Sequence, residues 1–370
     1  MWTLARKTLA KEPGRLTISI AGVAFAVAFM ILLRGLYVAY DERVSDFYGA
    51  LGVDAWVLQS GTGDKLTESR LARKLEGQLR DLPGVAAVTP WKAKHTTFNL
   101  HGDTVALYIA GFEQTSGAPD TGPLRMEQGR RTIGDDEIIL DEVFARKQGL
   151  EVGDVLVVRG QRLTVAGISS GGDLVTFQYG YVTEKRADEL FDVGGKANAY
   201  LLQLEPGADL AGVTAAVQRI ADDVDVKSAA WILKRNSRIV REGFLPVVGV
   251  LLALGFFVGV AVIGLTIFSA VLEHRRDYGV MKAIGARPLQ MLVVVAVQAL
   301  SAAAAGYAVG LGAALLVVWA AEAWVPQFIT HIMPGDLVLV GVAAIVMGLV
   351  AALAPMRRIA RLDPAIVFRA

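Results

Sequence analysis

Hydrophobic residues are gathered into four long blocks, and the stretches between them carry a mixed pattern of polar and apolar positions. The first block, residues 16–40, contains one charged residue, Arg34. The other three blocks contain no charged residue and cover residues 244–272, 289–321 and 337–354. A helix of about 20 apolar residues is long enough to cross the hydrocarbon layer of a bilayer. Each block is therefore predicted to be a transmembrane helix.

The region between the first and second blocks, residues 41–242, is rich in charged residues, turn signals and short alternating segments. Alternation predicts strands over residues 55–59 and 163–168. Helical spacing with polar faces predicts helices over residues 69–79 and 210–221. This region is expected to form a folded aqueous domain with both helices and strands.

Basic residues predict the orientation of the chain, because cytoplasmic loops of membrane proteins carry an excess of Lys and Arg. Both termini and residues 273–288 are expected in the cytoplasm, with residues 41–242 and 322–336 outside. The fold class is an α-helical membrane protein with four transmembrane helices plus an α+β extracytoplasmic domain inserted between helices 1 and 2. The basic clusters are Arg6, Lys7, Lys11 and Arg15; Arg275, Arg276, Lys282 and Arg287; and Arg357, Arg358, Arg361 and Arg369.

The first block has two readings, because the basic residues before it would also suit a cleaved signal peptide. Its length and the absence of a small-x-small site at residues 34–37 favour a retained helix. Arg34 lies near the outer end of this block, where its side chain is expected to reach the membrane surface. The pairs Gly255 and Gly259 and Gly306 and Gly310 suggest close helix packing but identify no dimer interface.

Composition supports a mixed membrane and aqueous protein. The chain is 54% hydrophobic and 20% charged, with a mean hydropathy of +0.45, which is too apolar for an ordinary soluble enzyme. Its 37 basic and 36 acidic residues give a net charge of +1, so no nucleic-acid partner is expected. The chain has no cysteine, which excludes disulfides, thiol catalysis and cysteine-ligated zinc.

No group of residues predicts catalysis or metal binding. His95, His101, His331 and Met333 have no mutual spacing that indicates a ligand set. Trp56, Trp91, Phe98 and Tyr108 are expected to form a domain core rather than a groove for an amphiphile. The chain also lacks a Gly-x-x-x-x-Gly-Lys-Ser/Thr motif for nucleotide phosphates. It is therefore expected to be no enzyme and to bind no cofactor or metal itself.

The segment between the second and third blocks predicts an amphipathic helix. Charged residues at Glu273, Arg276 and Asp277 share one helical face, and an apolar stripe with Met281 lies beside them. Gly285 and Pro288, which follow, would end the element. The alternative is a solvated loop whose basic residues satisfy topology and lipid headgroups.

Three segments resemble one family. Residues 273–287 resemble the cytoplasmic signature of FtsX-like permeases, and residues 355–369 are similar to the basic, proline-containing tail of the same family. Residues 141–168 resemble the extracytoplasmic domain of MacB-like permeases. His274, Asp277 and Tyr278 depart from the usual residues of the cytoplasmic signature. The chain is thus similar to FtsX-like, MacB-type ABC transporter permeases of the type VII, mechanotransmission superfamily, including DevC- and LolC-like members.

The resemblance implies three domains. They are residues 1–40 with a cytoplasmic helix and transmembrane helix 1, residues 41–242 with the MacB-like domain, and residues 243–370 with the FtsX-like domain. In this family a cytoplasmic coupling helix, here residues 273–288, docks on a separate ATP-binding subunit that holds ATP and Mg²⁺. The implied contact residues are Glu273, Arg275, Arg276, Asp277, Gly279, Lys282 and Gly285.

The implied partners are the ATP-binding subunit, a second permease copy in a homodimer or paralogous heterodimer, membrane lipids and a membrane-fusion adaptor. The implied function is ATP-driven export or extraction of an amphiphile, such as a lipid, lipoprotein, peptide or drug, at the extracytoplasmic side. The alternative is an FtsX-like regulator that relays the ATPase state to an extracytoplasmic cell-wall hydrolase without transport. The size of region 41–242 favours the first function.

The double substitution Gly285→Trp with Arg276→Glu tests the coupling helix. It places a bulky side chain and a reversed charge on the surface expected to meet the ATP-binding subunit, so assembly and the change in ATPase turnover should both be lost. The test is the ATPase activity of the partner subunit in nanodiscs, measured with the intact permease and with the variant. Normal assembly and turnover with the variant would mean that residues 273–288 form a lipid-facing loop.

Overall fold

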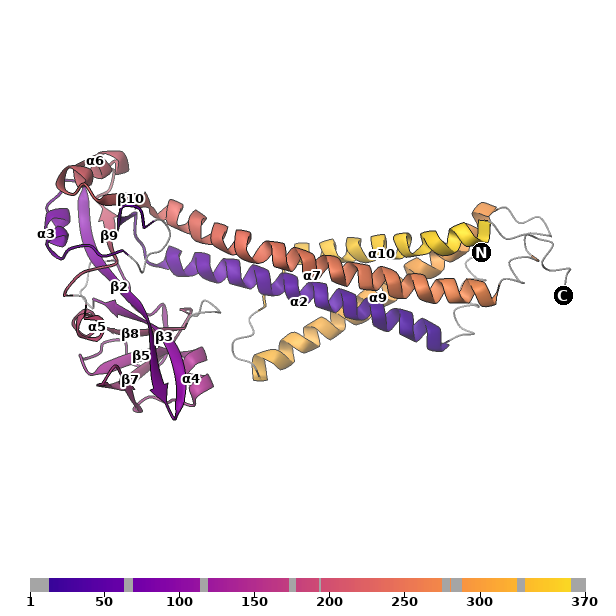
Figure 1. Ribbon diagram of the computed structural model, residues 1–370, viewed down its shortest axis with the longest axis horizontal. Coiled ribbons are helices and arrows are strands. Elements are labelled where there is room, and N and C mark those ends of the chain that lie inside the picture. Colours follow the sequence, from indigo (N-terminus) through magenta and orange to yellow (C-terminus); the bar gives the residue numbers. More distant parts are fainter. Residues whose placement is uncertain are drawn as a thin grey trace. The chain divides into compact units, whose positions relative to one another are not determined.

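The computed structural model describes residues 13–62, 69–113, 119–172, 178–192, 194–274, 280, 288–324 and 330–360. The chain divides into two compact units. One unit, here called the helical unit, contains the residues up to Ala39 and those from Gly243 onwards. The other, the inserted domain, contains residues Tyr40–Glu242 (Figure 1).

Within the described residues, four long helices are apolar enough to cross a membrane, as the four hydrophobic blocks predict. Each extends beyond its block. In particular, α2 continues to residue 50 and α7 begins at residue 229, so both also run through part of the polar region of the sequence. The four helices are α2 (Pro13–Ala50), α7 (Ala229–Glu273), α9 (Pro288–Trp324) and α10 (Pro334–Ala360) (Figure 1).

Small residues bring the four helices close together in the helical unit. A Cβ atom added to Gly306 would lie 2.4 Å from Val23 Cβ, and one added to Gly310 would lie 2.6 Å from the carbonyl oxygen of Ala24. On α7, a Cβ at Gly259 would lie 2.4 Å from Met347 Sδ. The glycine pairs therefore serve packing within this chain. The apolar core that they allow includes Val27, Ile31, Ile263, Val295, Ala303 and Ala351.

The inserted domain is organised around one long strand, β2 (Val85–Leu100). Its first half pairs with β9 up to Trp91, and its second half pairs with β3 from Lys92 onwards. The strand order is β10-β1-β9-β2-β3-β8-β5-β7-β4, with β6 beside β7. The other strands are β1 (Ala55–Gln59), β3 (Asp103–Phe112), β4 (Arg125–Gly129), β5 (Glu137–Asp141), β6 (Val155–Val158), β7 (Gln161–Ser170), β8 (Tyr179–Thr183), β9 (Ala199–Leu204) and β10 (Val224–Ser228).

Two separate hydrophobic cores lie on either side of this crossover and define two lobes. The first lobe contains β1, β9, β10 and the first half of β2, with helices α3 (Lys74–Arg80) and α6 (Leu210–Ile220). The second lobe contains the other strands with α4 (Glu142–Gln148) and α5 (Glu184–Phe191). Because β2 contributes to both cores, it is the covalent connection that the two sheets share.

The predicted elements of this domain are largely confirmed. The strand at residues 55–59 and the helix at 210–220 are present. The helix expected over 69–79 begins only at Lys74, because Leu71 forms an antiparallel bridge with Ala197 instead. The short helix α4 ends at Gly149, whose φ of 65° is the left-handed conformation that favours glycine.

Gly310→Ala is predicted to destabilise the helical unit, because the added methyl group meets backbone that cannot rotate away. We expect a loss of about 1–3 kcal/mol, typical of overpacking. Gly312→Ala on the same helix is the matched control, since nothing lies within 4 Å of its Cβ position. Thermal unfolding in detergent compares the two; equal midpoints would contradict the packing role of Gly310.

Candidate functional site at the β2 crossover

The predicted coupling helix is only partly covered by the structure. Glu273 is the last residue of α7. The remaining predicted contact residues lie outside the described residues, so their role stays a prediction. They are Arg275, Arg276, Asp277, Gly279, Lys282 and Gly285.

A buried lysine marks the point at which β2 passes from the first lobe to the second. The side chain of Lys92 is 3% exposed, and its Nζ atom lies 2.6 Å from Glu184 Oε1 and 2.8 Å from Asp188 Oδ1. The two carboxylates lie one turn apart on α5 and so share a helical face. A buried ammonium group requires such partners, because desolvation penalises an unpaired charge. Lys92 therefore ties β2 to α5.

Asn198 completes the backbone hydrogen bonds at the same crossover. Its N–H donates to the carbonyl oxygen of Trp91 over 2.9 Å. Its side-chain oxygen accepts from the N–H of Ala93 over 2.8 Å, and its side-chain amide donates to the carbonyl oxygen of Ser69. Since buried backbone groups need partners, Asn198 supplies them to Trp91 and Ala93 at the point where β2 leaves β9 and joins β3.

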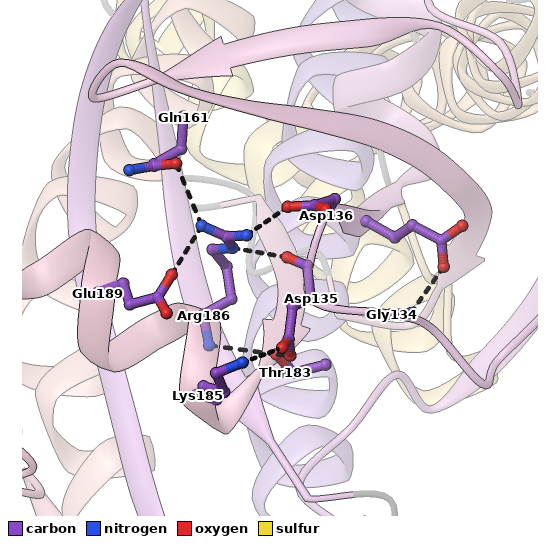
Figure 2. Close-up of polar contacts among 9 residues, drawn as sticks. Gly134, Asp135, Asp136, Gln161, Thr183, Lys185, Arg186 and Glu189 are labelled. Carbon is purple, nitrogen blue, oxygen red and sulfur yellow. Dashed lines mark hydrogen bonds and ion pairs between the residues drawn. The ribbon is translucent and has the colours of Figure 1, made fainter.

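The opposite side of α5 is held by Arg186 (Figure 2). Its guanidinium donates to Glu189 over 2.7 Å, to the carbonyl oxygen of Asp135 over 2.6 Å, and also to Asp136. Lys185 donates to the Asp135 carboxylate, and this hydrogen bond lowers the pKa of Asp135 and raises the pKa of Lys185. With contacts on both sides, α5 is a fixed support for the Lys92 ammonium group.

The C-terminal end of α2 packs against the crossover from within the inserted domain. Phe47 is 1% exposed. Its ring stacks on Tyr179 at a centroid distance of 4.9 Å and meets Trp91 edge-on at 6.3 Å. Trp91 directly precedes Lys92, and Trp56 lies against it at 6.0 Å. The core role predicted for Trp56, Trp91 and Phe98 is confirmed by their burial.

Polar side-chain contacts also join α2 to α7 within the inserted domain. The hydroxyl groups of Ser45 and Ser237 are 3.3 Å apart. The guanidinium of Arg241 lies 3.7 Å from the Asp41 carboxylate. The two helices are thus paired where they meet the domain.

In the helical unit, Arg34 forms an ion pair that the sequence analysis did not predict. Its Nε donates to Asp336 Oδ1 over 2.7 Å, and the side chain of Asp336 is 6% exposed. The physical reason is that a charge within a spanning helix is stabilised by a buried countercharge. The N–H of His331 also donates to the carbonyl oxygen of Gly35 over 3.0 Å, so the segment before α10 is held against α2.

Sequence reasoning missed the Lys92, Glu184 and Asp188 cluster. One signal was available, since the two acids have i, i+4 spacing. That spacing alone does not identify a partner on another element.

Two models of known protein families match this chain. A family model described as MacB-like periplasmic core domain matches residues 16–220, and one described as FtsX-like permease C-terminal matches residues 249–364. The chain belongs to the FtsX/MacB family of ABC transporter permeases. The inserted domain is accordingly a MacB-like domain.

Relatives along almost the whole chain support this assignment. An uncharacterized ABC transporter permease of Mycobacterium tuberculosis (strain ATCC 25618 / H37Rv) is 27% identical over 363 residues, covering 96% of this chain and 95% of the relative. A second permease of that organism is 26% identical over 363 residues, with the same two coverages of 96% and 95%.

Among solved structures, the extracellular domain of YknZ from Gram-positive bacteria is 17% identical with a TM-score of 0.38, covering 47% of this chain and 98% of that chain. The periplasmic region of MacB from Actinobacillus actinomycetemcomitans is 14% identical with a TM-score of 0.39, covering 50% and 94%.

Membership in this family shows the general role of the chain. It is a multi-pass membrane protein. Its relatives are permeases of ABC transporters, so it works with an ATP-binding partner, and the ATPase is on that separate subunit.

Lys92→Ala is predicted to destabilise the MacB-like domain, because Glu184 and Asp188 would keep two partly buried charges without a countercharge. We expect a loss of about 2–4 kcal/mol. Lys185→Ala, which removes an exposed ion pair on the same helix, should change stability little. Thermal unfolding and hydrogen exchange of α5 in the full chain measure both; equal effects would contradict the special role of Lys92.

Proposed function

We propose that this permease couples ATP hydrolysis by its partner subunit to extraction or export of an amphiphile, such as a lipid, lipoprotein, peptide or drug, at the extracytoplasmic side. Two permease copies, identical or paralogous, would work with two ATP-binding subunits that hold ATP and Mg²⁺. The cytoplasmic termini and the coupling helix at residues 273–288 belong to this proposal, and they rest on the basic clusters and on the family resemblance.

The observation that carries the proposal is the continuity of two helices. α2 and α7 each have one end in the MacB-like domain and also contain a span of the helical unit, and α7 remains helical through Pro246. A helix transmits displacement along its axis because its backbone hydrogen bonds lie along that axis. Movement of α2 would therefore act on Phe47 and on the Trp91 side chain against which it packs.

The Lys92 contacts determine what such movement does. Because Lys92 ties β2 to α5, and β2 belongs to both lobes, displacement at Trp91 would move the MacB-like domain as one body. Such coupling requires two arrangements of the packed helices, each favoured by a different nucleotide state. The domain movement would then displace the amphiphile.

Phe47→Ala tests this linkage, because it removes the ring that joins α2 to the crossover. The complex with the ATP-binding subunit should still hydrolyse ATP, but the ATP-dependent change in distance between two spin-labelled MacB-like domains should be lost. Phe25→Ala is the matched control, since Phe25 is on the same helix and is 64% exposed. A Phe47→Ala complex with an unchanged ATP response would contradict the linkage.

The same complex separates transport from regulation. ATP-dependent movement of a fluorescent phospholipid out of proteoliposomes into an acceptor would support transport. Domain movement without displacement of that lipid, of a lipopeptide or of an amphiphilic drug would favour the regulatory alternative.

A further inference from the structure

The C-terminal end of α9 leaves the core of the helical unit. Ala314 is 0% exposed, and in the part of the chain that the structure describes it is the last buried residue of α9. Leu315, Leu316 and Val317, which follow directly, are all exposed. Three successive residues of a helix cover an arc of about 200°, because one turn contains 3.6 residues. This exposed arc is wider than the apolar stripe of about 100° with which a helix packs on one neighbouring surface.

Two tryptophans stand on this exposed end. Trp319 is 73% exposed, and Trp324, the last residue of α9, is 86% exposed. They are five residues apart and therefore point in directions about 140° apart around the helix axis. A partner packed on one side of α9 would cover only one of them. The Trp side chain joins a large apolar ring system to one N–H donor, and it is enriched where hydrocarbon meets lipid headgroups.

The depth of the tryptophans follows from the packing of α9 on α2. The glycine contacts described above show that the two helices run in the same direction, and a Cβ at Gly310 would lie 2.9 Å from Val27 Cβ. Trp319 is about 14 Å beyond Gly310 along α9, and Arg34 is about 10 Å beyond Val27 along α2. α9 crosses the other helices of the unit obliquely (Figure 1), which shortens its rise along them. Trp319 therefore lies close to the level of the Arg34 and Asp336 ion pair, where charged groups end the apolar layer.

We propose that the end of α9, residues 315–324, lies in the leaflet on the side where α2 continues into the inserted domain, with Trp319 and Trp324 at the lipid headgroups. Lipid is the occupant because it covers the whole exposed arc and both tryptophans, which one protein surface does not. The indole N–H groups donate to oxygen atoms of the headgroup region, and Leu316 contacts acyl chains. This anchor goes beyond the transport proposed above, because it requires neither ATP nor the partner subunit.

Tryptophan fluorescence of the full-length permease in nanodiscs of brominated phosphatidylcholine tests the anchor. The contribution of Trp324 is the difference between the wild type and Trp324→Phe, a variant that keeps an aromatic ring. We expect bromine near the headgroup to quench this contribution about twofold more strongly than bromine near the ends of the acyl chains, because the ring lies at headgroup level. Trp319→Phe should give the same order of quenching.

Trp231→Phe is the matched control. Trp231 belongs to the inserted domain and lies about 18 Å along α7 from Gly243, where the helical unit resumes. Aqueous iodide, and not brominated lipid, should quench its contribution. If Trp324 behaved in the same way, the end of α9 would project into water and the proposal would be wrong. Protection of Trp324 from both quenchers would also overturn it, because a protein surface would then cover this end of the helix.

Discussion

A lysine ammonium group buried in a protein interior needs countercharges close by, and the architecture of the inserted domain depends on how Lys92 obtains them. Glu184 and Asp188 on α5 supply both carboxylates. Since Lys92 stands where β2 leaves one sheet for the other, the ion pairs hold the strand, α5 and the second lobe together. The aromatic contact of Phe47 with Trp91 brings the end of α2 to the same point. One crossover thus joins both lobes to a helix that also contains a membrane span.

The apolar blocks were predictable because a span is a local property of about 20 consecutive residues. The extension of α2 to Ala50 was not predictable, because residues 41–50 are mixed in polarity and their helical state depends on tertiary packing. Val44, Phe47 and Leu51 are buried at i, i+3 and i+7, a pattern too short to predict a helix by itself.

The charged contacts could not be predicted from the sequence, for a different reason. Lys92 and its acceptors are separated by 92 and 96 residues, and Arg34 and Asp336 by 302 residues. Pairing over such separations is decided by the fold, whereas sequence spacing indicates only partners on one helix. The coupling helix at residues 273–288 remains a prediction from a motif, and the family assignment supports it only at the level of an ATP-binding partner.

The central claim is that the crossover makes the MacB-like domain one rigid body that α2 can move. The most direct test is the distance between spin labels at Lys147→Cys on α4 and Arg219→Cys on α6, one in each lobe, in a chain without native cysteine. Pulsed EPR on the complex with the ATP-binding subunit should give the same narrow distribution with and without ATP. A distribution that shifts or broadens when ATP binds would mean that the lobes move against each other at β2, and the account would be wrong.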